Sequence, residues 1–102
     1  DVPGPPDAPI ISEIFKDSCQ ATWSPPESDG GAPIIGYHIE RRQATSTRWV
    51  KVNTDVIEEL TMKATGLNEG MDYEFRVAAE NKAGIGKYSP PSKPFKAKDP
   101  WG

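Results

Sequence analysis

The sequence of 102 residues has one cysteine, Cys19, and no Asn-x-Ser/Thr tripeptide. A single thiol cannot form a disulfide within the chain, although small secreted domains usually depend on at least one such bridge. The missing glycosylation acceptor points the same way. Together the two absences favour an intracellular protein over a secreted one.

The sequence also lacks an excess of positive charge. It has 12 Lys and Arg against 15 Asp and Glu, which gives a formal net charge of −3. Binding of nucleic acid or of anionic lipid by charge requires a basic surface. With 35% hydrophobic and 26% charged residues, the chain is too mixed for a membrane span. We therefore expect neither nucleic acid nor a membrane as a partner.

Windows long enough for a helix are scarce, because 11 prolines and 9 glycines interrupt the chain. The length suits one domain. We expect that domain at residues 8–98, between Pro-rich or Pro-containing linkers at 1–7 and 99–102. The two ends each place Asp, Pro and Gly within four residues. This similarity indicates successive copies of one linker in a tandem array, with chance similarity of two tails as the alternative.

Short segments in which apolar and polar residues alternate are separated by turn residues, as in a β protein. The longest alternating segment is residues 73–80. The expected strands are residues 10–15, 19–23, 35–43, 49–52, 60–65, 73–80 and 92–98. Seven short strands at this spacing predict an all-β, antiparallel two-sheet sandwich.

Two segments need a closer look. Ile11 and Ile14 are three residues apart, so a strand can bury both on one face only through a bulge or a bend. Residues 55–63 contain good helix formers, but the alternation of apolar residues from Leu60 onwards favours a strand there.

The inward positions of the strands supply the candidate core. Cys19 is in phase with Trp23, which predicts a buried and unreactive thiol. The expected core residues are Cys19, Trp23, Tyr37, Ile39, Leu67, Tyr73, Phe75 and Val77.

Enzymatic chemistry needs a nucleophile with a base, paired carboxylates in a cleft or a cage of metal ligands. The only imidazole, His38, falls on the outward face of its strand, which favours a surface histidine over a base or a ligand. Glu58 and Glu59 lack the Asp/Asn/Gly loop pattern of a calcium site. We therefore expect no catalytic, cofactor-binding or metal-binding residues and no enzyme activity.

The outward faces of residues 35–43 and 73–80 carry charges of both signs. The candidate protein-binding face consists of His38, Glu40, Arg42, Trp49 and Arg76. The alternative is a solvated face whose charges pair across neighbouring strands. Trp49 either packs over the second sheet or marks a partner patch, and Trp101 either docks on a neighbouring module or moves freely.

Three landmarks resemble those of a fibronectin type III domain across essentially the whole chain. They are Trp23 followed by Ser24-Pro25-Pro26, Tyr37, and Leu67 followed six residues later by Tyr73. The resemblance implies an immunoglobulin-like sandwich with a tyrosine corner, in which the Tyr73 hydroxyl bonds to upstream backbone. Gly70 departs from many family members, which carry Pro or a longer side chain there.

Three longer stretches narrow the resemblance to the modules of the giant muscle proteins titin, twitchin and myosin-binding protein C. These stretches are residues 29–42, 48–53 and 73–84. The resemblance implies a noncatalytic spacer or scaffold module of a giant sarcomeric protein in the cytoplasm of muscle. Its implied partners are thick-filament proteins such as myosin, or neighbouring modules of the same chain, and the isolated domain is expected to be a monomer.

The alternative is a ligand-binding fibronectin type III module of an extracellular adhesion protein or receptor. The single Cys19, the missing glycan acceptor and the absence of Arg-Gly-Asp and Trp-Ser-x-Trp-Ser motifs disfavour it.

Overall fold

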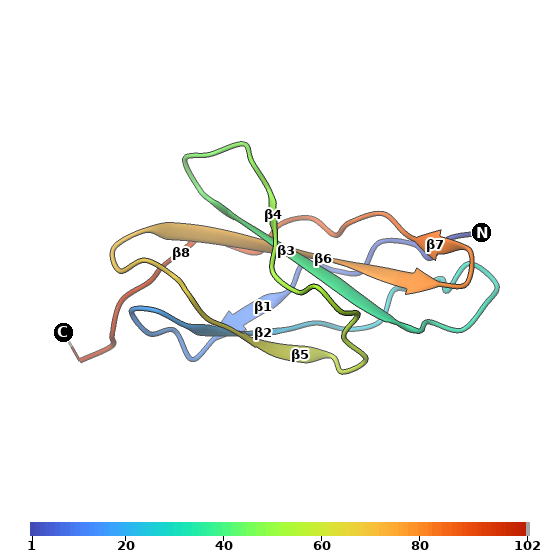
Figure 1. Ribbon diagram of the computed structural model, residues 1–102, viewed down its shortest axis with the longest axis horizontal. Helices are drawn as coiled ribbons and strands as arrows, with labels where there is room; N and C mark the ends of the chain where they lie inside the picture. Colours follow the sequence, from blue (N-terminus) through green and yellow to red (C-terminus); the bar gives the residue numbers. More distant parts are fainter. Residues whose placement is uncertain (102) are drawn as a thin grey trace.

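Two antiparallel sheets face each other in the computed structural model, which describes residues 1–101 (Figure 1). The three-stranded sheet has the order β1 (Ile10–Ser12), β2 (Cys19–Thr22) and β5 (Thr61–Ala64). The five-stranded sheet has the order β4 (Val50–Lys51), β3 (Gly36–Gln43), β6 (Asp72–Asn81) and β7 (Gly84–Ile85), with β8 (Phe95–Lys96) also paired to β6. The described residues contain no helix. The all-β sandwich predicted from the sequence is confirmed.

The longest ladder joins β3 to β6, with a register from Gly36 opposite Glu80 to Gln43 opposite Tyr73. Side chains alternate between the two faces of a strand. Tyr37 and Ile39 on β3 therefore share the inner face with Phe75 and Val77 on β6. The polar residues between them lie on the outer face, where the candidate binding residues are found.

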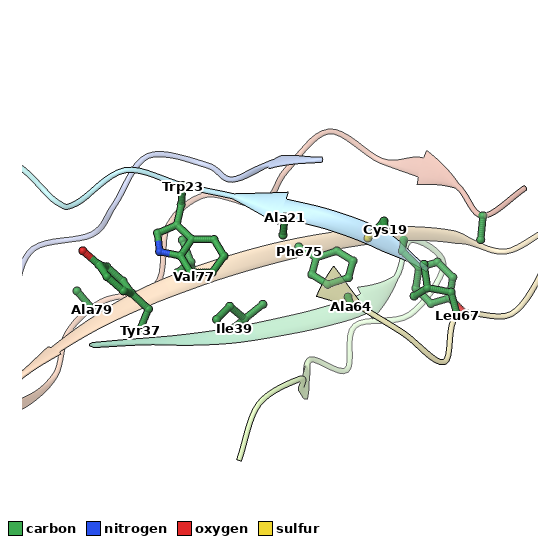
Figure 2. Packing of buried hydrophobic residues seen from close by; sticks show 12 residues of the cluster. Cys19, Ala21, Trp23, Tyr37, Ile39, Ala64, Leu67, Phe75, Val77 and Ala79 are labelled. Atoms are coloured by element: carbon green, nitrogen blue, oxygen red, sulfur yellow. The ribbon is translucent and has the colours of Figure 1, made fainter. Parts of the chain in front are cut away.

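The core lies between the sheets, where side chains from both interlock (Figure 2). Trp23 packs edge-on against Tyr37, with ring centroids 5.8 Å apart. Phe75 and Val77 are fully buried. All eight residues expected in the core from the sequence belong to this cluster, which also contains Ala21, Ala64, Ala79 and Ala97. The alanines leave room for the large rings between the sheets.

Leu67 and Tyr73 form the corner that the family resemblance implied. The Tyr73 ring is buried, and its hydroxyl oxygen accepts a hydrogen bond of 2.8 Å from the backbone N–H of Asn68. The backbone N–H of Leu67 donates to the carbonyl of Asp17, at 3.0 Å. The corner therefore ties the start of β6 to the turn before β2.

The C-terminal part of the sandwich differs from the expected single strand at 92–98. Two short strands, β7 and β8, pair with β6 instead, so the described chain has eight strands where seven were expected. Between them the hydroxyls of Ser89 and Ser92 accept hydrogen bonds from the backbone N–H groups of Val77 and Phe75. Prolines in this segment cannot donate to a ladder. Serine side chains thus supply partners where a regular strand is interrupted.

Both segments singled out in the sequence contain strands shorter than expected, since β1 ends at Ser12 and β5 covers only Thr61–Ala64. Glu13 has φ of 47° and lies between Ile11 and Ile14, which both pack against the core, so the expected bend is confirmed. Residues 55–63 contain no helix: Ile57 forms a single β-bridge with Tyr37, and β5 begins at Thr61.

Replacement of Trp23 by Ala is expected to lower the free energy of unfolding by about 3–5 kcal/mol, because it removes a buried indole from between the sheets. Trp101 is 76% exposed, so Trp101→Ala is the control and should cost less than about 1 kcal/mol. Urea unfolding followed by circular dichroism measures both. Equal costs for the two variants would contradict the role given to Trp23.

Burial raises the pKa of the Cys19 thiol from 9.0 to about 11, against a smaller lowering by Arg41. The unfolded thiol ionises near pH 9 while the folded one stays protonated, so this contribution to stability is complete below pH 9 and is lost as pH rises towards 11. The loss should approach about 1.4 kcal/mol per pH unit within that window. Urea unfolding of the protein and of Cys19→Ala at pH 8 to 10.5 tests this, since the variant should have the shallower slope.

Candidate functional site

The outer face of the β3–β6 ladder is a strip of paired charges. Glu40 lies directly opposite Arg76 in the register. The Arg76 guanidinium donates to Oε1 of Glu40 through Nη2 at 2.6 Å and through Nε at 2.9 Å. Both side chains are mostly covered, with 28% and 16% of their surface exposed. Charge-assisted bonds of this kind are among the stronger side-chain contacts, and they hold the guanidinium in one orientation.

Two further pairs continue the strip on either side. Nη2 of Arg42 lies 3.6 Å from Oε1 of Glu74, and Nε2 of His38 lies 2.6 Å from Oε1 of Glu80. Three side-chain pairs thus join β3 to β6 on this face, while Asp72 at the start of β6 pairs with Lys96 of β8. The cross-strand pairing considered as the alternative to a binding face is therefore present in the structure.

His38 is less accessible than the expected surface histidine, because only 7% of the residue is exposed. Its ring lies opposite Ala78, a small and buried residue, and contacts Glu80. Its Nδ1 is buried without a protein partner. Among the described residues no Ser, Thr or Cys is hydrogen-bonded to this imidazole, so the pair does not form a nucleophile with its base.

Two aromatic side chains enclose the Arg76 guanidinium. Its Cζ lies 4.2 Å from the centre of the Trp49 ring and 4.5 Å from that of Tyr88. The Cζ of Arg42 lies 4.8 Å from the Trp49 ring. Cations over aromatic faces are attracted by the ring quadrupole. Trp49 thus packs on the outer face, and it does so over two of the residues grouped with it from the sequence.

Tyr88 is the member of this cluster that the sequence did not reveal. It lies between β7 and β8, in an irregular segment where no strand period marks which side chains point to the sheet. Burial raises the pKa of the Tyr88 phenol, and the Glu40 carboxylate raises it by its charge and by a hydrogen bond, against a lowering by the charge of Arg76. Tyr88 completes a cluster with Glu40, Arg42, Trp49 and Arg76, which we call the stacked cluster.

A shallow hollow of about 330 Å³ adjoins the stacked cluster at the end of β3. Its lining includes three arginines, Arg41, Arg42 and Arg48, and no acidic residue. Arg41 is held in place by hydrogen bonds to the carbonyls of Thr65 and Gly66. The outer face therefore combines fixed guanidinium groups with aromatic surface, which suits contact with a protein rather than a reaction.

Residues 1–101 contain no group of three or more side chains placed to hold a metal ion. The same part of the chain has no helix long and apolar enough to cross a membrane.

Comparison with known proteins places this geometry in a family. Residues 4–95 match the model of the fibronectin type III domain. Cardiac-type myosin-binding protein C from Gallus gallus is 47% identical over 95 residues, which cover 93% of this chain and 8% of that protein. The chain therefore spans a small fraction of the length of this curated relative.

Two solved structures are also similar. Domains A168–A170 from titin superpose with a TM-score of 0.92 and 39% sequence identity, over 97% of this chain and 33% of that one. The kinase region of twitchin from C. elegans superposes with a TM-score of 0.89 and 34% identity, over 98% of this chain and 17% of that one. In both, the match covers one part of a longer chain.

The stack of Trp49 on Arg76 predicts a measurable coupling between the two side chains. Single Trp49→Ala and Arg76→Met variants and the double variant form a mutant cycle. The interaction free energy should be about 0.5–2 kcal/mol, because the guanidinium is partly desolvated between two rings. Urea unfolding of the four proteins measures it. A cycle of Trp49 with Lys63, which lies on β5 of the other sheet, should give a value near zero, and equal values in both cycles would contradict the stack.

Proposed function

The chain belongs to the fibronectin type III family, and from that premise we propose that it is a noncatalytic structural and protein-interaction module of a giant muscle protein. The observation that carries this proposal is the similarity to myosin-binding protein C, which extends over 93% of this chain but only 8% of that protein. A unit that recurs inside much longer chains serves them as one module of an array. The titin and twitchin matches support the same reading.

The shape supports a role as spacer and scaffold. The chain ends lie at opposite ends of a molecule whose longest extent is 47 Å (Figure 1). β1 pairs with β2 in an antiparallel ladder at Ile10–Ser12. A pull along the long axis would load these bonds together rather than one after another. The free and buried Cys19 agrees with the reducing cytoplasm of a muscle cell, and supports this role over the extracellular alternative.

The stacked cluster supports the interaction role. Trp, Tyr and Arg are the residue types that most often dominate binding energy at protein interfaces. Here the pairing with Glu40 and the ring contacts hold the guanidinium groups before any partner arrives. Such preorganisation lowers the entropic cost of binding. Because the relative is a myosin-binding protein, we propose myosin or another thick-filament protein of the sarcomere as the partner.

Co-sedimentation of the domain with myosin filaments tests this face. The triple variant Glu40→Gln, Arg42→Gln and Arg76→Gln should bind at least about tenfold more weakly, because it removes the charges at the centre of the face. The matched control, Glu59→Gln, Lys63→Gln and Lys16→Gln, also changes one acid and two bases, at exposed positions outside the stacked cluster.

Circular dichroism verifies that both triple variants remain folded. Unchanged binding of the first variant would contradict the proposed face. Failure of the unmodified domain to sediment would contradict myosin as the partner and leave the structural role intact.

A further inference from the structure

The first six residues lie against the sandwich, although their composition predicts a linker. Pro3 and Pro6 are among the fully buried residues. The backbone N–H of Gly4 donates to the carbonyl of Ser28, at 2.9 Å. Figure 1 shows the N-terminal end beside β7, and the Val2 side chain lies against the backbone of Gly84. We call residues 1–6 the strap.

Asn81, at the end of β6, binds the strap through its side chain. Only 1% of this residue is exposed. Its Nδ2 donates to the carbonyl of Asp1 at 2.8 Å and to that of Asp29 at 2.7 Å, while its Oδ1 accepts from the N–H of Ala83. One buried amide therefore joins the strap to both neighbouring loops. Without the strap one of its donors would lose its protein partner, which is costly in a buried position.

The strap occupies space that side chains would fill if two glycines of the groove were other residues. A Cβ atom on Gly86 would collide with the carbonyl group of Pro3, and one on Gly30 would collide with the carbonyls of Asp1 and Val2. Gly30 has a positive φ, which by itself favours glycine. Gly86 does not, so backbone conformation gives no reason for glycine there. The close approach of Pro3 supplies that reason.

The composition of the strap suits this site. Proline has no N–H group, so burial of Pro3 and Pro6 leaves no backbone donor unpaired. Its fixed φ also reduces the conformational entropy that is lost when an extended segment is held in place. An extended, Pro-containing segment is thus recognised through its carbonyl groups and its narrow backbone.

We propose that residues 28–31 and 81–86 form a groove that binds the strap as an intramolecular ligand. The groove fixes the path of residues 1–6 along the loops between β2 and β3 and between β6 and β7. The direction of the chain at Asp1 is therefore fixed relative to the sandwich. The strap is therefore a rigid segment of the folded domain and not a flexible linker. This inference concerns the domain itself and does not depend on the muscle partner.

Hydrogen exchange and 15N relaxation of the full chain test the groove through three single variants. In Gly86→Ala and Gly30→Ala the protection of the Gly4 amide should fall at least about tenfold, with rising mobility at Val2, while amides of the β3–β6 ladder keep their protection. Gly31→Ala is the matched control. Gly31 also has a positive φ, but a Cβ atom there meets nothing within 4 Å. It therefore also places an alanine at a positive φ, as Gly30→Ala does, without touching the strap.

Equal protection of Gly4 in all three variants would overturn the proposal. If Gly86→Ala does not fold, the comparison of Gly30→Ala with Gly31→Ala decides, since these two differ in their contact with the strap. If Gly30→Ala fails to fold while Gly31→Ala folds, the result also supports the groove. If Gly30→Ala and Gly31→Ala show the same folding and the same protection of the Gly4 amide, the groove is ruled out.

Discussion

The ladder between β3 and β6 is the constraint on which the other features depend. Its register spans all eight residues of β3 and places one side of both strands in the core and the other on the outer face of the sheet. The rings of Tyr37 and Phe75 and the ion pair of Glu40 with Arg76 therefore have a common origin. A slip of one residue would exchange the two faces, burying charges and exposing rings. The hydrophobic core consequently fixes the geometry of the outer face.

Strict alternation made the two strands and their inward faces predictable from sequence, because apolar residues recur at every second position in residues 35–39 and 73–79. Prediction from the sequence was weaker for residues whose contacts come from segments that are distant along the chain. Tyr88 lies in a segment without period, and the concealment of His38 depends on the small Ala78 across the strand. The division of the last strand depends on serine hydroxyls that replace backbone partners. The packing of the first residues depends on Gly86, whose missing side chain has no local signature.

The charges of the paired strip on the outer face balance one another, and their side chains are held in fixed positions. Opposite charges compensate one another along the strip, so it does not attract partners over long distances as a basic patch would. Its guanidinium groups are nevertheless fixed by rings and carboxylates. Recognition by such a surface depends on shape and short-range contact, which gives specificity through the fit of planar groups. The adjoining hollow adds Arg41 and Arg48 beside this strip, and no acidic residue lines it.

The prolines around the last strand have a consequence for a chain of many similar domains. Neighbouring domains of one chain are at a high effective concentration, and exposed strand edges are templates for pairing between them. Pro91 and Pro94 precede β8, and Pro9 precedes β1, so the chain has no backbone donor at these positions beside two of the sheet edges. Where such a domain stands in an array, prolines at these positions disfavour strand pairing between neighbouring domains.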